Sequence, residues 1–132
     1  MINTKLKLIA EGMKRAEGWI PPTKTAETYT NGSISYRHHN PGNLRSSRFQ
    51  LGEKDGFAYF LDDEIGMMAM LYDLHAKMTG KSAHVDAATA TLYDLLRVWV
   101  APDNEDSFNN YTDIVERVSG VPRDTPVRDI IK

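Results

Sequence analysis

Residues 17–45 combine an acidic residue at a helix break with the densest turn chemistry in the chain. A pattern typical of an amphipathic helix ends at Gly18, directly after Glu17. A loop rich in proline and threonine follows. The Asn-Pro-Gly-Asn sequence at 40–43 then predicts a tight turn, because proline fixes φ and glycine permits a positive φ. Polar side chains held by such backbone residues are more often part of a site than of a core. We therefore expect a site built around one carboxylate.

Length and composition bound the class of protein. The 132 residues suffice for one domain with a core. A net charge of −2 gives no electrostatic reason to expect nucleic acid. The absence of cysteine excludes disulfide frameworks, zinc ribbons and thiol nucleophiles, and the four histidines include no i, i+4 pair, so neither a metal nor a cofactor is expected. No apolar run is long enough for a membrane span or a signal peptide.

The spacing of apolar residues predicts a mainly α chain of the α+β class. Helices are expected over residues 4–17, from Asp62 or Asp63 to about 78, from Thr91 to just before Pro102, and over about 107–119. The second of these helices is expected to bury one apolar face, which comprises Ile65, Met68, Ala69, Tyr72 and Ala76. Another helix is expected to begin after Pro122.

Short β structure is expected between the first two helices. Residues 21–33 are predicted to be a loop with a tight turn at Asn31-Gly32, and residues 33–36 a short strand. Residues 44–60 are predicted to form a β-hairpin, with residues 52–56 as its turn.

Two glutamates compete for the role of the functional acid. Glu11 lies in the middle of the first helix, with Lys7 and Arg15 one turn away, which suits a solvated ion pair. Glu17 lies at the carboxyl end of that helix beside Trp19, where the helix dipole and an apolar neighbour both disfavour the charged form. Glu17 is therefore the candidate acid. The alternative is an ordinary surface glutamate at a helix end.

The order of motifs resembles that of a known family. A first helix with Glu-Gly-Trp, then Ser-Ile-Ser-Tyr-Arg-x-x-Asn-Pro-Gly-Asn-Leu-Arg and Gly-Phe-Ala-x-Phe, resembles a phage-associated group of the lysozyme-like superfamily. The Trp-Val-Ala-Pro sequence at 99–102 and the acidic segment leading to Tyr111 are similar to a later motif of that group. His38 and His39 depart from it, since the group commonly has asparagine there. The resemblance spans about residues 8–127.

This resemblance implies a lysozyme-like fold over residues 1–132, a helical bundle whose small β-hairpin lines the substrate cleft. It implies one catalytic domain, with excision from a longer phage protein left open. The implied activity is that of a lytic transglycosylase, which cleaves the β-1,4 bond between MurNAc and GlcNAc in peptidoglycan. Glu17 would give a proton to the leaving oxygen and take one from the sugar's 6-hydroxyl, which closes a 1,6-anhydro ring.

Several polar residues are candidates for holding the substrate. Amide, hydroxyl and guanidinium groups near the acid suit sugar hydroxyls and acetamides; the candidates are Ser35, Arg37, Asn40, Asn43 and Tyr111. The alternative for the asparagines is simple turn chemistry, in which the side chain bonds to nearby backbone. The alternative for the tyrosine is packing on a helix face.

Two other functions remain open. A muramidase that uses water would need a second carboxylate, for which Asp62, Asp103 and Asp106 are candidates. A non-catalytic virion or tail protein could keep the fold for assembly or glycan binding. The expected partners are peptidoglycan glycan strands, together with other virion or tail proteins, and neither nucleic acid nor membrane insertion is expected. The expected location is the virion or the host periplasm and cell wall.

Overall fold

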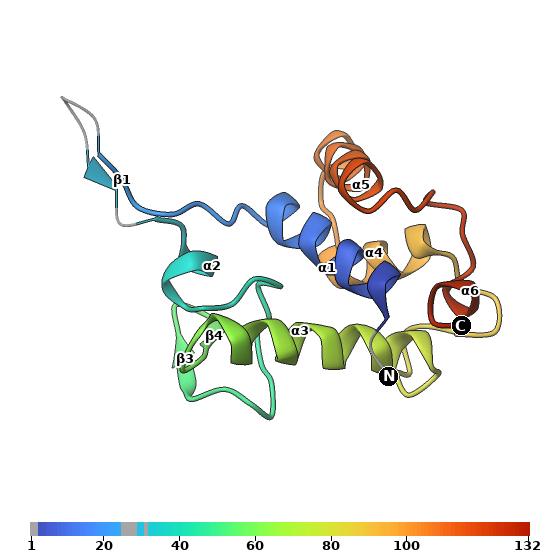
Figure 1. Ribbon diagram of the computed structural model, residues 1–132, viewed down its shortest axis with the longest axis horizontal. Helices are drawn as coiled ribbons and strands as arrows, with labels where there is room; N and C mark the ends of the chain where they lie inside the picture. Colours follow the sequence, from blue (N-terminus) through green and yellow to red (C-terminus); the bar gives the residue numbers. More distant parts are fainter. Residues whose placement is uncertain (1–2, 25–28, 31) are drawn as a thin grey trace. The chain divides into compact units, whose positions relative to one another are not determined.

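The computed structural model describes residues 3–24, 29–30 and 32–132 (Figure 1). The chain forms two compact units. The first, here called the helical unit, comprises Met1–Ala16 and Leu71–Lys132, and the second, called the turn unit, comprises Glu17–Met70. The structure is mainly helical with short β structure, as the sequence predicted, and the described residues contain two small antiparallel sheets. Its membership of the lysozyme-like fold stays a prediction.

The first helix of the helical unit, α1 (Thr4–Ala16), begins at a side-chain cap. The Oδ1 atom of Asn3 accepts a hydrogen bond from the amide of Leu6 at 2.8 Å, which satisfies one of the free amides of the first turn. The helix packs against α5 (Glu105–Ser119) (Figure 1). A Cβ atom on Gly12 would lie only 2.9 Å from the Cα of Val115, so the contact requires glycine.

The helix α4 (Leu92–Val100) starts with a capping box at Thr91, where the sequence predicted a helix to begin. The Thr91 amide donates to the Asp94 carboxylate at 2.9 Å, and the Asp94 amide donates to the Thr91 hydroxyl at 3.3 Å. The helix α6 (Val127–Ile130) begins beside the start of α4, because the Val127 amide donates to the Ala90 carbonyl at 2.9 Å. The Ile130 carbonyl accepts a hydrogen bond from the Asn3 side chain at 2.7 Å. The two ends of the described chain therefore meet within this unit.

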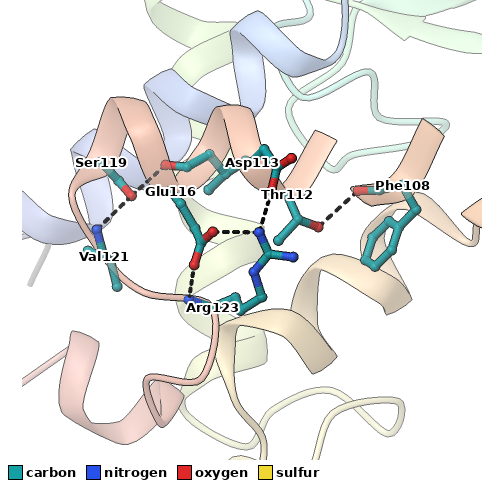
Figure 2. Close-up of polar contacts among 8 residues, drawn as sticks. Phe108, Thr112, Asp113, Glu116, Ser119, Val121 and Arg123 are labelled. Atoms are coloured by element: carbon teal, nitrogen blue, oxygen red, sulfur yellow. Dashed lines mark hydrogen bonds and ion pairs between the residues drawn. The ribbon is translucent and has the colours of Figure 1, made fainter. Parts of the chain in front are cut away.

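The loop after α5 is fastened to that helix by Arg123 (Figure 2). Its guanidinium lies 2.5 Å from the carboxylates of Asp113 and Glu116, and its backbone amide donates to Glu116 at 2.7 Å. These hydrogen bonds from Arg123 lower the pKa of the Glu116 carboxyl. The core of the helical unit is formed by buried side chains from its helices: Leu6, Ile9, Met13, Leu74, Met78, Leu92, Leu95, Leu96, Phe108, Val115, Val127 and Ile130.

The turn unit begins with structure that the sequence did not predict. The segment expected to be only a loop contains a paired β1 (Thr23–Lys24) and β2 (Tyr29–Thr30). Gly32, in the predicted tight turn, has a φ of +90°, whereas Asn31 lies outside the described residues.

The strand predicted at residues 33–36 is wrong, because these residues form the helix α2 (Ile34–Arg37). The Ser33 hydroxyl caps this helix by accepting from the Tyr36 amide at 3.4 Å. A local bond from a serine side chain to the backbone competes with strand pairing, and here it decides the structure.

The predicted hairpin is present with a shifted turn. Its strands are β3 (Gly52–Lys54) and β4 (Phe57–Tyr59), paired antiparallel with Lys54 opposite Phe57. Asp55 and Gly56, with φ of +57° and +83°, form a two-residue turn. Asp-Gly favours such a turn because both central residues need a positive φ. The turn is therefore shorter than the five residues expected, and Gly52–Lys54 belongs to a strand.

The helix α3 (Asp63–Met78) begins in the turn unit, where Asp62 caps it by accepting from the Ile65 amide at 2.9 Å. A small core forms around Ala58, Phe60 and Ala69, with Leu44, Phe49 and Ile65 packed against it. The predicted buried face is partly wrong, because Met68 and Tyr72 are exposed.

Gly66 gives the reason for this difference. A Cβ atom there would lie 1.7 Å from the carbonyl oxygen of His39, so the backbone before the Asn-Pro-Gly-Asn turn lies directly on the helix. The face that carries Gly66 and Ala69 therefore points inward. Among the described residues, no helix has both the length and the apolar character needed to cross a membrane.

Candidate functional site

The candidate acid Glu17 lies directly after α1, half-buried, in a segment that is tied to the start of α2. The amide of Ile20 donates to the Ser33 hydroxyl at 3.0 Å, and the amide of Ser33 donates to the Ile20 carbonyl at 2.9 Å. This reciprocal pair fixes the backbone three residues beyond the acid. Such a fixed backbone can hold a carboxylate in one position.

Ser35 adds another hydrogen bond to this connection between residues 17–20 and α2. Its hydroxyl lies 3.1 Å from that of Ser33 and donates to the carbonyl of Gly18 at 3.4 Å. Because Ser35 gives its only hydrogen to Gly18, Ser33 is the donor between the two hydroxyls. Ser35 is buried, so in this structure it supports the residue next to Glu17, and its predicted contact with substrate stays a prediction.

Two residues of this connection were not predicted as site residues, namely Ser33 and Tyr36. The ring of Tyr36 packs edge-to-face with Trp19, with ring centres 5.2 Å apart and an angle of 66° between the planes. A serine three residues before an amide that needs capping is a helix-start signal, and this signal could have identified Ser33.

Asn40 is placed differently from what was predicted. Its side chain has no exposed surface. Its Nδ2 atom donates to the carbonyls of Leu44 at 2.9 Å and Ala58 at 3.0 Å, while Oδ1 accepts from the Leu44 amide at 2.9 Å. The amide therefore joins the turn to β4 and has no donor left for a sugar, so the predicted contact between Asn40 and substrate is corrected to a structural role.

Asn43 closes the turn and is half-buried. Its amide donates to the Asn40 carbonyl at 3.1 Å, and its φ is +54°. The residue with positive φ is thus the second asparagine, and not Gly42 as expected. Asparagine tolerates this conformation better than most residues. A contact between Asn43 and substrate stays a prediction.

Arg37 lies exposed at the end of α2 beside a hollow of about 320 Å³. Its Nε atom donates to the carbonyl of Gly32 at 3.2 Å. The hollow is formed within the turn unit, and its lining residues are Arg37, His38, His39, Lys54, Tyr59, Phe60 and Leu61.

Tyr111 belongs to the helical unit, and Glu17 belongs to the turn unit. The tyrosine is nearly buried and lines a second hollow of about 290 Å³. Polar and apolar side chains contribute equally to the rest of the lining, which comprises Ala16, Val100, Pro102, Asp103, Asn104, Ser107, Phe108 and Asn110. Ala16 is the residue bonded to Glu17. A direct interaction between Tyr111 and Glu17 stays a prediction.

The three aspartates considered as a second carboxylate lie in different surroundings. Asp62 caps α3, and Asp106 is exposed in the first turn of α5. Asp103 lines the same hollow as Tyr111. In the part of the chain that the structure describes, no cluster of three or more histidine or acidic side chains has a geometry suited to a metal ion.

Comparison of the chain with protein-family models, with curated proteins and with solved structures gives no match. A functional interpretation must therefore be built on the residues themselves. Their main feature is a half-buried carboxylate whose following backbone is held by two serines.

Proposed function

We propose that the chain is a peptidoglycan-cleaving lytic transglycosylase in which Glu17 is the acid and base. The proposal rests mainly on the connection between residues 17–20 and α2, made by the paired bonds of Ile20 with Ser33 and by the bond from Ser35 to Gly18. A general acid works only when it is held within hydrogen-bonding distance of the atom that it protonates. The hydrogen bonds between residues 17–20 and α2 restrict the backbone beside Glu17 in this way.

The proposed chemistry needs one carboxylic acid. Protonated Glu17 gives its proton to the glycosidic oxygen between MurNAc and GlcNAc, and the C1–O bond breaks through an oxocarbenium-like state. The 6-hydroxyl of the same MurNAc attacks C1 and loses its proton to Glu17. The products are a 1,6-anhydro-MurNAc end and a free GlcNAc 4-hydroxyl, and the acid is ready for another cycle.

The hollow beside Tyr111 supports the choice of a glycan substrate. It offers the side chains of Asn104, Asn110 and Ser107 next to the rings of Tyr111 and Phe108. Saccharide sites combine such hydrogen-bonding groups with flat apolar surfaces, because sugars have polar edges and apolar faces. The aspartate in the same lining, Asp103, is the feature that favours a muramidase as the second candidate function.

The test is mass spectrometry of fragments released from purified sacculi by the wild type and by Glu17→Gln. Glu11→Gln is a matched control, since Glu11 lies on α1, the helix that precedes Glu17, and pairs with Lys14 at 3.9 Å. We expect 1,6-anhydro fragments from the wild type and the control, and about 10²- to 10⁴-fold less from Glu17→Gln, the range for loss of a general acid. Circular dichroism of each variant establishes that it is folded.

Other outcomes of the fragment-release experiment would change either the proposed function or the assignment of the acid. Fragments with reducing ends would identify a muramidase, and Asp103→Asn would then be the next variant. Undiminished release by folded Glu17→Gln would refute the assignment of the acid. No release by the wild type from several wall types would refute the enzymatic proposal and favour a non-catalytic virion or tail protein.

A further inference from the structure

The hollow beside α2 carries two positive charges from different elements. Arg37 lies at the end of α2, and Lys54 is the last residue of β3. Within the described residues, neither side chain forms an ion pair with a carboxylate, and no aspartate or glutamate lines the hollow. Its lining is therefore positively charged although the chain as a whole is slightly acidic.

The guanidinium of Arg37 is oriented by its own backbone surroundings. Its Nε atom donates to the Gly32 carbonyl at 3.2 Å. A Cβ atom on Gly32 would lie 2.7 Å from the Ile20 carbonyl oxygen, so the position of that acceptor is itself restricted. The two terminal nitrogens have no bond to any described residue, and their geometry suits the two oxygens of a carboxylate.

His38 adds a further polar group to the hollow, and His39 binds the carboxylate of Asp63. The Nδ1 atom of His38 lies 3.3 Å from the Ala58 carbonyl and carries the hydrogen, so in the neutral ring Nε2 is left as an acceptor for a donor group of the ligand. The Nδ1 atom of His39 lies 2.6 Å from the carboxylate of Asp63. The carboxylate of Asp63 therefore already has a partner among the lining residues.

The remaining wall of the hollow is apolar. Tyr59 and Leu61 line it and are exposed, with 37% and 63% of their surface accessible. The ring of Tyr59 is held edge-on by His38, with ring centres 6.2 Å apart. A ligand that fits must therefore combine an anionic group with a short apolar or peptide-like chain.

We propose that this hollow is a carboxylate-binding subsite. The carboxylate binds between Arg37 and Lys54, and the chain that carries it lies along Tyr59 and Leu61. If the proposed function holds, on which this part rests, the ligand is a carboxylate of the peptide stem attached to MurNAc. The enzyme would then recognise the peptide stem as well as the glycan strand.

The first experiment tests carboxylate binding without reference to catalysis. Succinate and its uncharged diamide are titrated into the ¹⁵N-labelled chain, and the NMR signals of the Arg37 Nε and of the His38 ring are followed. We expect succinate alone to shift both signals. Arg37→Gln and Lys54→Gln should each weaken binding about two- to fivefold, the range for exposed ion pairs. Arg117→Gln and Lys81→Gln, exposed elsewhere, should leave it unchanged.

The second experiment identifies the source of the carboxylate. Binding of the Glu17→Gln chain to native sacculi is compared with binding to sacculi whose carboxylates have been converted to amides. Amidation should weaken binding, and adding Arg37→Gln or Lys54→Gln should weaken binding to the native form only. Arg37→Lys, which keeps the charge, should restore part of the binding.

The results separate this inference from the proposed function. Anhydro fragments released by the wild type, without any succinate-induced shift, would overturn the subsite and leave the function standing. Succinate binding with no dependence of sacculus binding on Arg37 or Lys54 would overturn the assignment to peptide stems. Succinate binding by a chain that never cleaves sacculi would support the carboxylate site and refute the transglycosylase.

Discussion

Ile20 and Ser33 exchange two hydrogen bonds, one from each amide, at 3.0 and 2.9 Å. The first ends on the Ser33 hydroxyl and the second on the Ile20 carbonyl, so the two residues are held in register although twelve residues separate them in the sequence. The same hydroxyl caps α2. One side-chain oxygen therefore controls both the start of that helix and the backbone that follows Glu17.

Replacement of this hydroxyl should affect activity more than stability. Ser33→Ala removes a helix cap, which costs about 0.5–2 kcal/mol of unfolding free energy. It also removes one of the bonds that hold the backbone after Glu17. We therefore expect the rate of fragment release to fall by more than the loss of unfolding free energy explains. Ser33→Thr keeps the oxygen and should restore most of the rate. Equal rates for Ser33→Ala and the wild type would show that this bond does not position the acid.

The buried amide of Asn40 should be indispensable for the fold of the turn unit. Asn40→Asp keeps the shape but replaces the donor that serves two carbonyls with an acceptor. We expect a loss of at least about 3 kcal/mol, because the carbonyls of Leu44 and Ala58 each lose one of their donors and face a buried negative charge. Asn43→Gly is the control, since glycine accepts the φ of +54° without strain. Chemical denaturation measures both. A stable Asn40→Asp would contradict the buried position of this amide.

The contact between Gly66 and His39 predicts a severe steric effect. Gly66→Ala would bring a methyl carbon to within 1.7 Å of the His39 carbonyl oxygen. The backbone must then move apart, and we expect about 3 kcal/mol of destabilisation, the upper range for an overpacked core. Met68→Ala, exposed on the same helix, should change the stability by less than about 0.5 kcal/mol. Thermal unfolding of both variants tests this prediction. Similar melting temperatures for Gly66→Ala and Met68→Ala would mean that the close approach is absent.

The ion pairs of Arg123 predict how stability depends on pH. Hydrogen bonds from Arg123 lower the pKa of Glu116 from its ordinary value of 4.5, so the folded chain binds this proton less readily than the unfolded chain. The resulting stabilisation is complete above that value and is lost as the pH falls through the lower folded value. Arg123→Gln should therefore cost about 0.5–1 kcal/mol at pH 7, the range for partly exposed pairs, and the difference should shrink below about pH 4.

Urea denaturation of Arg123→Gln and the wild type between pH 3 and 7 measures this difference. Arg117→Gln, at an exposed position of α5 next to Glu116, should follow the wild type at every pH. A constant cost of Arg123→Gln across the range would show that its effect comes from packing and not from charge.

The sequence predicted those elements whose cause lies within the element itself. The helices capped by Asn3, Asp62 and Thr91 begin where the sequence predicted, because a cap needs only residues within one turn. The buried face of α3 was predicted wrongly because a distant contact decides it. The rotation of α3 depends on Gly66 meeting His39, which its own apolar pattern does not reveal.

The candidate site shows the same division. The turn at 40–43 could be recognised from its composition, whereas the choice of Glu17 over Glu11 stays a prediction. The burial of Asn40 could not be recognised, because it depends on the carbonyl of Ala58, which lies eighteen residues away in β4. The role of Ser33 was hidden by an alternating pattern that is also typical of a strand.

The contact of Gly12 with Val115 also has a consequence for synthesis on the ribosome. α1 is translated before the turn unit, whereas the helix that covers its apolar face, α5, is translated after the whole turn unit. The turn unit is continuous in sequence and can fold as soon as it emerges, whereas the helical unit must wait for both of its parts. Throughout that interval the stripe formed by Leu6, Ile9 and Met13 lacks its native cover. The nascent chain should therefore present α1 to chaperones until α5 has left the exit tunnel.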